Sequence, residues 1–194
     1  MTLFRMGLLE SNPAACECLK TMGVLSDFTV QEVYSLLRHE SQKPPYPECV
    51  SPFYSYNNAR KEYKVDEILD ELCEAQLVLR RLPSTEPFAL IEPLSVSLGV
   101  RLWVRNLSIS ERIKVAKQAI GMVAELRSLV NFQDLYSHMR NTWLYTELAP
   151  SSRDNIELRV LYEWLSVFRI AGDSELVKSI STVILKRDIE QKSQ

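Results

Sequence analysis

Three side chains near the middle of the chain, Arg101, Trp103 and Arg105, are of types that bind nucleic acids or partner proteins. Two guanidinium groups beside an indole ring can hold phosphates and stack a nucleobase. Tryptophan and arginine are also typical of the residues that contribute most to the binding energy of protein interfaces. We therefore take these three residues as candidate partner-binding residues.

The pattern around these residues predicts that they share one face of a β-strand. Between Ser95 and Leu107 every second residue is apolar: Val96, Leu98, Val100, Leu102 and Val104. Such a period of two is typical of a strand with one buried face. Residues 88–92 could pair with it across Pro93, so we expect a strand or a small hairpin over about residues 88–107. Without a partner in its own chain, the 95–105 strand would pack on helices or join two copies into a homo-oligomer.

A second candidate surface is a proline-rich segment, residues 41–58, that also carries aromatic side chains. Its prolines remove backbone donors and favour extended conformations, so no regular element is expected. The aromatic residues are Tyr46, Phe53, Tyr54 and Tyr56. A disordered linker is usually poor in aromatic residues. We therefore expect these side chains to lie against the chain's own core or against a partner protein.

Charged residues gather in two further places. The segment 101–127 carries the basic residues Arg101, Arg105, Arg112, Lys114, Lys117 and Arg127. The acidic residues Asp66, Glu67, Asp70, Glu71 and Glu74 lie close together on a predicted helix. The basic segment indicates nucleic-acid binding, but the pI of about 5.8 counts against it because most nucleic-acid-binding domains are basic. The acidic band is interpreted as a solvated helix face or as a docking face for a basic surface.

Histidine and cysteine do not fall into a catalytic or metal-binding pattern. Nucleophilic catalysis needs a base beside the nucleophile, and neither His39 nor His138 lies in such a motif. His39 closes a predicted helix, where a cationic ring suits the helix dipole. His138 lies beside an apolar helix stripe, where we expect a half-buried structural residue. The spacing of Cys16, Cys18 and Cys49 is not that of a zinc site, so we expect no enzyme, no metal and no cofactor.

The N-terminal half is predicted to contain helices on either side of the proline-rich segment. Residues 1–40 should hold short helices, one of which starts at Asn12 and Pro13 and runs to about Gly23. After the proline-rich segment, a long helix is predicted over 59–82, followed by loop and strand over 83–107.

Residues 108–190 are predicted to form four helices with short connections. The expected ranges are about 109–130, 132–148, 153–171 and 174–190. Ser108, Asn131 and Ser152 are the expected N-caps, and Gly172 is the expected left-handed stop. Short connections favour antiparallel packing. The predicted fold class is therefore mainly α, a helical array or bundle with one strand or small β-hairpin inserted, in a single domain over 1–194.

Composition limits the class of protein. The chain has 194 residues, a net charge of -2 and 46% hydrophobic residues, which together are typical of a globular domain. No stretch approaches the roughly 20 apolar residues of a membrane span, and no export signal is recognisable. Four cysteines without an export signal suit a reducing compartment. We expect a cytoplasmic or nuclear protein that does not contact the membrane.

The leading functional hypothesis is a non-enzymatic protein-interaction adaptor, or a subunit of a larger complex. One alternative is a nucleic-acid-binding accessory factor that uses the 101–117 basic segment. Another is a viral or host regulatory protein that sequesters a partner. The candidate binding residues for the first hypothesis are Arg101, Trp103, Arg105, Tyr46, Phe53, Tyr54 and Tyr56.

Overall fold

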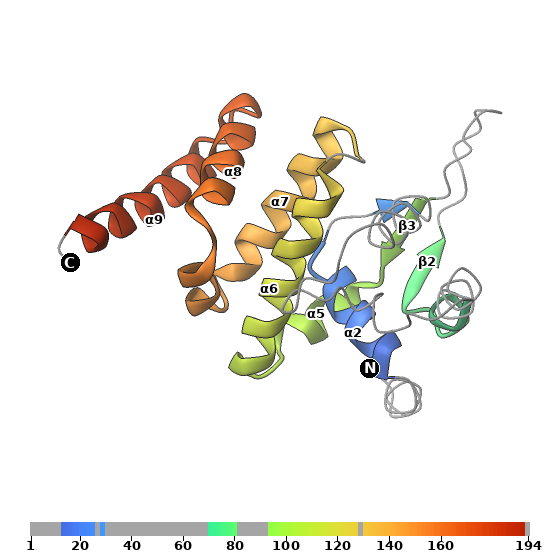
Figure 1. Ribbon diagram of the computed structural model, residues 1–194. Coiled ribbons are helices and arrows are strands. Elements are labelled where there is room, and N and C mark those ends of the chain that lie inside the picture. The colour runs from blue at the N-terminus through green and yellow to red at the C-terminus, as the bar shows by residue number, and fades with distance from the viewer. Residues whose placement is uncertain (1–12, 26–27, 30–69, 81–92, 128–129, 193–194) are drawn as a thin grey trace, which may run out of the picture.

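The computed structural model of the chain describes residues 13–25, 28–29, 70–80, 93–127 and 130–192. In these ranges helices predominate, and a small antiparallel sheet lies at one end of the molecule (Figure 1). The predicted fold class, mainly α with a small β-structure, is confirmed. No helix in the described ranges combines the length and the apolar character needed to cross a bilayer.

Helix α2, Pro13–Met22, is the short N-terminal helix predicted from its start signal. Its last turn ends where the amide of Gly23 donates to the carbonyl of Leu19 at 2.9 Å. Leu19 and Met22 are buried, and α2 packs on α5 and α6. The helix therefore closes one side of the core.

The sheet has three short strands, β1 (Phe28–Thr29), β2 (Val78–Arg80) and β3 (Pro93–Val96). Their order is β1-β3-β2, with antiparallel pairing on both sides of β3. The expectation that the central strand lacks a partner in its own chain is therefore wrong. At Leu94 both sides of β3 are paired within the chain, whereas Ser95 and Val96 pair with β2 alone. A homo-oligomer through the 95–105 segment stays a prediction. The proposed partner strand 88–92 lies outside the described residues.

The predicted strand over 95–107 is also wrong in extent, because Leu98–Arg105 forms helix α5. Ser97 is its extended N-cap, and its carbonyl accepts from the amides of Val100 and Arg101 at 3.0 and 3.2 Å. A longer strand would need ladder partners along its length. Strands β1 and β2 pair only with residues 93–96, whereas a helix satisfies its own backbone and still buries Val100 and Val104.

The long helix predicted over 59–82 ends earlier than expected, because residues 70–74 are helical and β2 follows at Val78. Gln76 has a left-handed φ of 55°. The amide of Gln76 donates to the carbonyl of Cys73, and that of Leu77 to the carbonyl of Leu72, both at 2.9 Å. This pair of bonds is a Schellman motif, which ends a helix. Residues 59–69 lie outside the described residues.

The four predicted C-terminal helices are present as α6 (Ile109–Leu126), α7 (Phe132–Thr146), α8 (Leu158–Ile170) and α9 (Ser174–Lys192). Ser108 and Asn131 cap α6 and α7 as predicted, and Gly172 has a φ of 75° after α8. The predicted start of α8 beside Ser152 is wrong. Residues Pro150–Asn155 form the 3-10 helix η2, and α8 begins only at Leu158.

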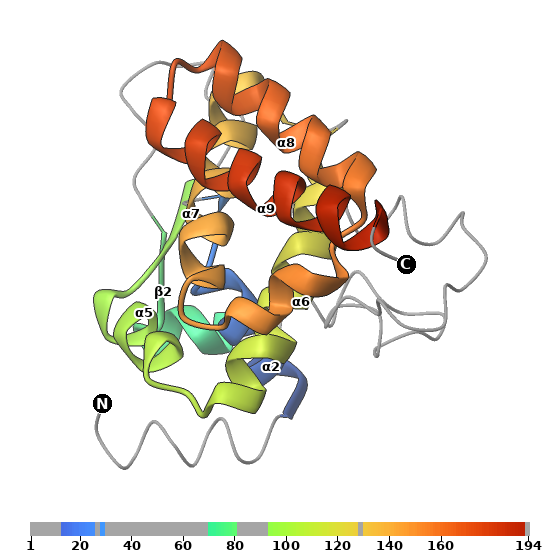
Figure 2. The same ribbon diagram turned by 90° about the vertical axis from the view of Figure 1, so that its left-hand side faces the viewer.

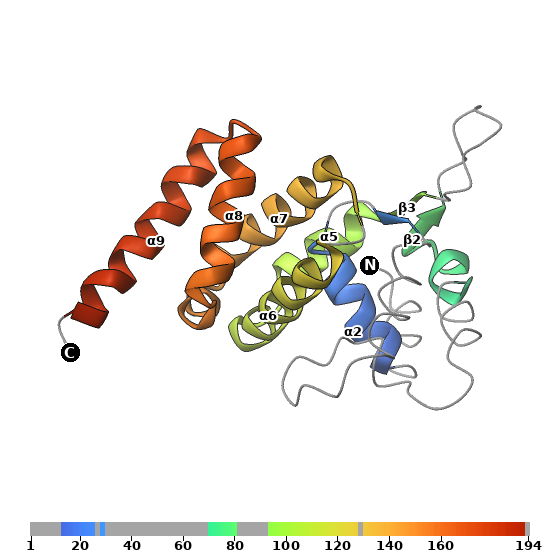
Figure 3. The same ribbon diagram turned by 45° about the horizontal axis from the view of Figure 1, so that its top comes forward.

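The helices form a row rather than a closed ring. Figure 3 shows the sheet and α2 at one end, α6 and α7 in the middle, and α8 and α9 at the other end. Seen from the α9 end, α8 and α9 lie side by side in front of α6 and α7 (Figure 2). Aromatic rings connect α7 and α8 in the α8–α9 half of the molecule. Trp143 contacts Trp164, and Trp164 contacts Phe168, at centroid distances of 6.2 and 6.4 Å. In this row α5 lies beside the sheet.

Candidate functional site

Arg101, Trp103 and Arg105 do not share a face, because they lie on a helix. Successive helical residues turn by about 100°, so positions 101 and 105 lie together and position 103 lies nearly opposite. Trp103 packs partly buried against the core, with Lys20 Nζ 6.0 Å from its ring centroid. Arg105 is exposed. The predicted single face that carries both guanidinium groups and the indole ring is therefore not formed.

The side of α5 that faces away from the core carries two leucines and two arginines. We call Leu98, Arg101, Leu102 and Arg105 the α5 outer face, because helical geometry places them within about 100° of one another. The side chains of Leu98 and Leu102 are 71% and 50% exposed. Arg101 is half-buried and donates from Nη1 to the carbonyl of Leu25 at 3.0 Å. The face is therefore an apolar pair bordered by cations.

Sequence reasoning named the arginines of this face but missed its leucines, which it placed on the buried side of a strand. The signal was present in the spacing, since positions 98 and 102, and positions 100 and 104, are each separated by four residues. Alternation over eight residues is also what a helix with two apolar faces produces. Val100 and Val104 have no exposed surface, so the other pair has to face outward.

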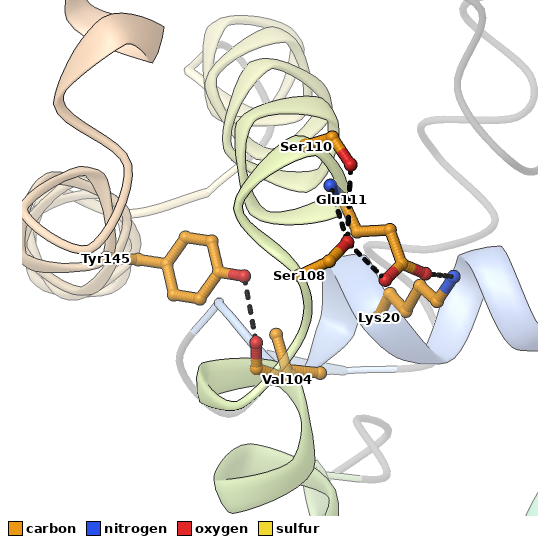
Figure 4. A network of polar contacts seen from close by, with 6 residues as sticks. All are labelled: Lys20, Val104, Ser108, Ser110, Glu111 and Tyr145. Atoms are coloured by element: carbon orange, nitrogen blue, oxygen red, sulfur yellow. Dashed lines mark hydrogen bonds and ion pairs between the residues drawn. The ribbon is translucent and has the colours of Figure 1, made fainter.

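Four helices meet where α5 passes into α6, and polar contacts hold them together (Figure 4). The hydroxyl of Tyr145, on α7, donates to the carbonyl of Val104 at 3.0 Å inside the core. Lys20, on α2, pairs with Glu111 of α6 at 3.3 Å. Ser108 accepts from the amide of Glu111 at 3.4 Å and donates to its carboxylate at 2.7 Å. We call these five residues the α5 junction; it fixes the direction in which the outer face points.

The ionisation of two junction residues follows from their surroundings. Burial raises the pKa of Tyr145 to about 12, so its phenol stays a neutral donor to Val104. The hydrogen bond from Ser108, and then that from Lys20, lower the pKa of Glu111 below its ordinary value of 4.5. The junction therefore favours a neutral tyrosine and a charged glutamate.

The lowered pKa of Glu111 predicts a loss of stability in acid. A carboxyl whose pKa is lower when folded stabilises the fold above its unfolded pKa, and this contribution disappears as the pH falls through the folded value. We expect the free energy of unfolding of Glu111→Gln to depend less on pH than that of the wild-type protein below about pH 5. Urea unfolding at a series of pH values measures this. Glu74→Gln, at an exposed carboxylate, is the control; equal pH profiles for wild type and Glu111→Gln would contradict the assignment.

Within the described ranges, the residues of the predicted basic segment and acidic band do not form one site. Arg127 of the basic segment is paired with Glu163 at 2.7 Å, whereas Lys114 and Lys117 are exposed on α6. Asp70, Glu71 and Glu74 of the acidic band are exposed on the 70–74 helix, and Asp66 and Glu67 lie outside the described residues. Binding of nucleic acid by the 101–117 segment stays a prediction, without the stacking face it was expected to use.

The remaining candidates are distributed as follows. His138 is fully buried in α7, deeper than the half-buried position expected. Cys16 and Cys73 form no disulfide, and the described ranges hold no group of three or more histidine, cysteine, aspartate and glutamate side chains that could bind a metal ion. Tyr46, Phe53, Tyr54 and Tyr56 lie outside the described residues, as do His39 and Cys49.

Comparison of the chain with protein-family models, with curated protein sequences and with solved structures finds no match.

Proposed function

We propose that the chain is a protein-interaction module whose α5 outer face binds an amphipathic segment of a partner protein. The observation that carries the proposal is the exposed pair Leu98 and Leu102 on a helix whose opposite side is fixed in the core. Burying one leucine side chain stabilises a complex by about 1.5–3 kcal/mol. Isolated exposed leucines are common, but a pair one helical turn apart is the arrangement by which helices bind in grooves.

The charges beside the leucines indicate the chemistry of the partner. Arg105 is exposed beside the apolar pair, whereas Arg101 already donates to the carbonyl of Leu25. We therefore expect a bound segment to carry apolar residues beside an aspartate or glutamate that faces Arg105. Arginine suits this position because its long apolar stem packs while its guanidinium group binds carboxylates. The α5 junction supports the proposal, because a helix already held in place loses little conformational entropy when a partner binds.

The test uses a photo-reactive amino acid at position 102 in the full chain, expressed in its native cells. We expect it to cross-link one partner protein that the same residue placed at position 170 does not capture. Ile170, on α8, is 72% exposed and is therefore a matched control. With the purified partner, Leu102→Asp should weaken binding at least about tenfold, since the leucine contributes about 1.5–3 kcal/mol. Ile170→Asp should bind as the wild type does.

Three outcomes would contradict the proposal. A partner that binds Leu102→Asp as tightly as wild type would place the interface elsewhere. A large loss of thermal stability in Leu102→Asp would show that the outer face is covered within the chain. Binding to nucleic acid that falls steeply with salt, and that is unaffected by Leu102→Asp, would favour the nucleic-acid alternative.

A further inference from the structure

A cavity of about 420 Å³, open to solvent, lies between η2 and the C-terminal half of α9. Its lining residues are Pro150, Arg153, Asp154, Val183, Lys186 and Arg187. Cavities that bind small molecules have volumes of about 300–1,000 Å³, so this one is large enough for a ligand. Three of its lining side chains are cationic and one is a carboxylate.

Arg153 is held rigidly at this cavity. Its Nε donates to the hydroxyl of Thr146 at 2.6 Å, and its Nη2 donates to the carbonyl of Trp143 at 3.3 Å. The guanidinium carbon lies 4.2 Å from the centroid of the Trp143 ring. Since the side chain is only 16% exposed, its orientation is fixed before any ligand arrives.

The charge of Arg153 is poorly compensated. Burial lowers the pKa of Arg153, and the neighbouring Glu147 carboxylate opposes this shift. Glu147 lies 3.6 Å away, but its side chain is 52% exposed and water screens the pair. Nη1 of Arg153 has no acceptor among the described residues, so two of its N–H groups remain for a ligand.

A second guanidinium group is fixed on the other wall. Arg187, on α9, donates from Nη1 to the carbonyl of Ile156 and from Nη2 to the carbonyl of Arg153. These bonds tie α9 to the connection between α7 and α8. Lys186 adds a third cation beside it. The two arginines and the lysine thus approach one cavity from two different elements.

We propose that this cavity binds a small molecule that carries a phosphoryl group. The fixed guanidinium group of Arg153 can donate to phosphate oxygens, and Arg187, whose Nη1 and Nη2 already donate to backbone carbonyls, adds positive charge beside it. A phosphate monoester has a charge of about −1.5 to −2 near neutral pH, which suits a cavity lined by three cationic side chains and one carboxylate. Pro150 and Val183 offer apolar contact to the organic part of the ligand. The carboxylate of Asp154 repels a phosphate, so its removal should strengthen binding.

The experiment measures binding to the full chain by calorimetry, with glycerol 3-phosphate, inorganic phosphate and sodium chloride at matched ionic strength as probes. We expect glycerol 3-phosphate to bind and to raise the melting temperature, and sodium chloride to do neither. Weaker binding of inorganic phosphate would show that the organic part contributes. Binding of inorganic phosphate without binding of glycerol 3-phosphate would support a phosphate site but contradict the proposed organic ligand. No binding of either phosphate probe would overturn the proposal.

Three variants decide whether any binding occurs in this cavity. Lys186→Gln should weaken binding about tenfold, as expected for the loss of one charge-assisted hydrogen bond. Lys178→Gln removes an exposed lysine elsewhere on α9 and should bind as wild type does. Asp154→Asn should bind more tightly, a result that a merely destabilised protein would not give. Equal affinities for Lys186→Gln, Asp154→Asn and wild type would place the ligand elsewhere and overturn the proposal.

Discussion

Replacing Trp143 with alanine is expected to lower the free energy of unfolding by about 3–5 kcal/mol, because the side chain has no exposed surface and fills the space between several elements. Its ring packs edge-on against Trp164 of α8 at 6.2 Å. Its Nε1 donates to the hydroxyl of Ser179 on α9 at 3.0 Å. A small domain is stable by only about 5–15 kcal/mol, so this loss is a large part of the total.

Urea unfolding followed by circular dichroism measures the effect of Trp143→Ala. Trp143→Phe keeps most of the ring but loses the N–H group, so its loss should be intermediate. Tyr162→Ala, on α8 at a side chain that is 52% exposed, is the control and should change stability by less than about 1 kcal/mol. A loss for Trp143→Ala as small as that of Tyr162→Ala would show that α7, α8 and α9 are not held together through this ring.

Gly23→Ala is the second large expected effect, a loss of about 1–3 kcal/mol from overpacking. A Cβ atom at Gly23 would lie 2.9 Å from Cγ2 of Val104 and 3.3 Å from the carbonyl oxygens of Leu19 and Lys20. Val104 is fully buried on α5, so α2 and α5 would have to move apart. Thermal and urea unfolding both measure the loss.

Gly99→Ala is the matched control, with the opposite expected sign. The nearest atom to a Cβ at Gly99 is Oγ of Ser97 at 4.0 Å, and Gly99 lies in α5. Alanine is favoured over glycine in helices by up to about 1 kcal/mol, so Gly99→Ala should be neutral or stabilising. In the double variant Gly23→Ala/Val104→Ala the steric clash disappears, and the two losses should not add. Additive losses would contradict the close contact of α2 with α5.

Helix ends show what could be predicted from the sequence and what could not. The Schellman motif that ends α8 has glycine in its left-handed position, Gly172, and the sequence predicted that end correctly. The helix over 70–74 ends with the same two bonds, but Gln76 occupies the left-handed position. Glutamine gives no local signal for this conformation. Tertiary packing of the buried Leu72 and Leu77 determines that end instead.

The α5 outer face was only partly predicted from the sequence, again because tertiary contacts determine the local structure. Local spacing identified Arg101 and Arg105, which both lie on the α5 outer face, Arg105 exposed and Arg101 half-buried. A period of two over eight residues does not by itself distinguish a strand from a helix with two apolar faces. The choice depends on which partners the backbone finds, and those are supplied by β1 and β2, which lie outside the 95–107 segment. Leu98 and Leu102 were therefore assigned to the wrong face.

The packing of α2 has a consequence for synthesis on the ribosome. Its apolar residues Leu19 and Met22 are synthesised well before α5 and α6, the described helices on which α2 packs. Likewise, Phe28 pairs with Leu94 only after the intervening chain has been translated. At a translation rate of about 5–20 residues per second, several seconds pass before the partners of the apolar side of α2 have been synthesised. During that interval the nascent chain presents a segment of the kind that chaperones bind.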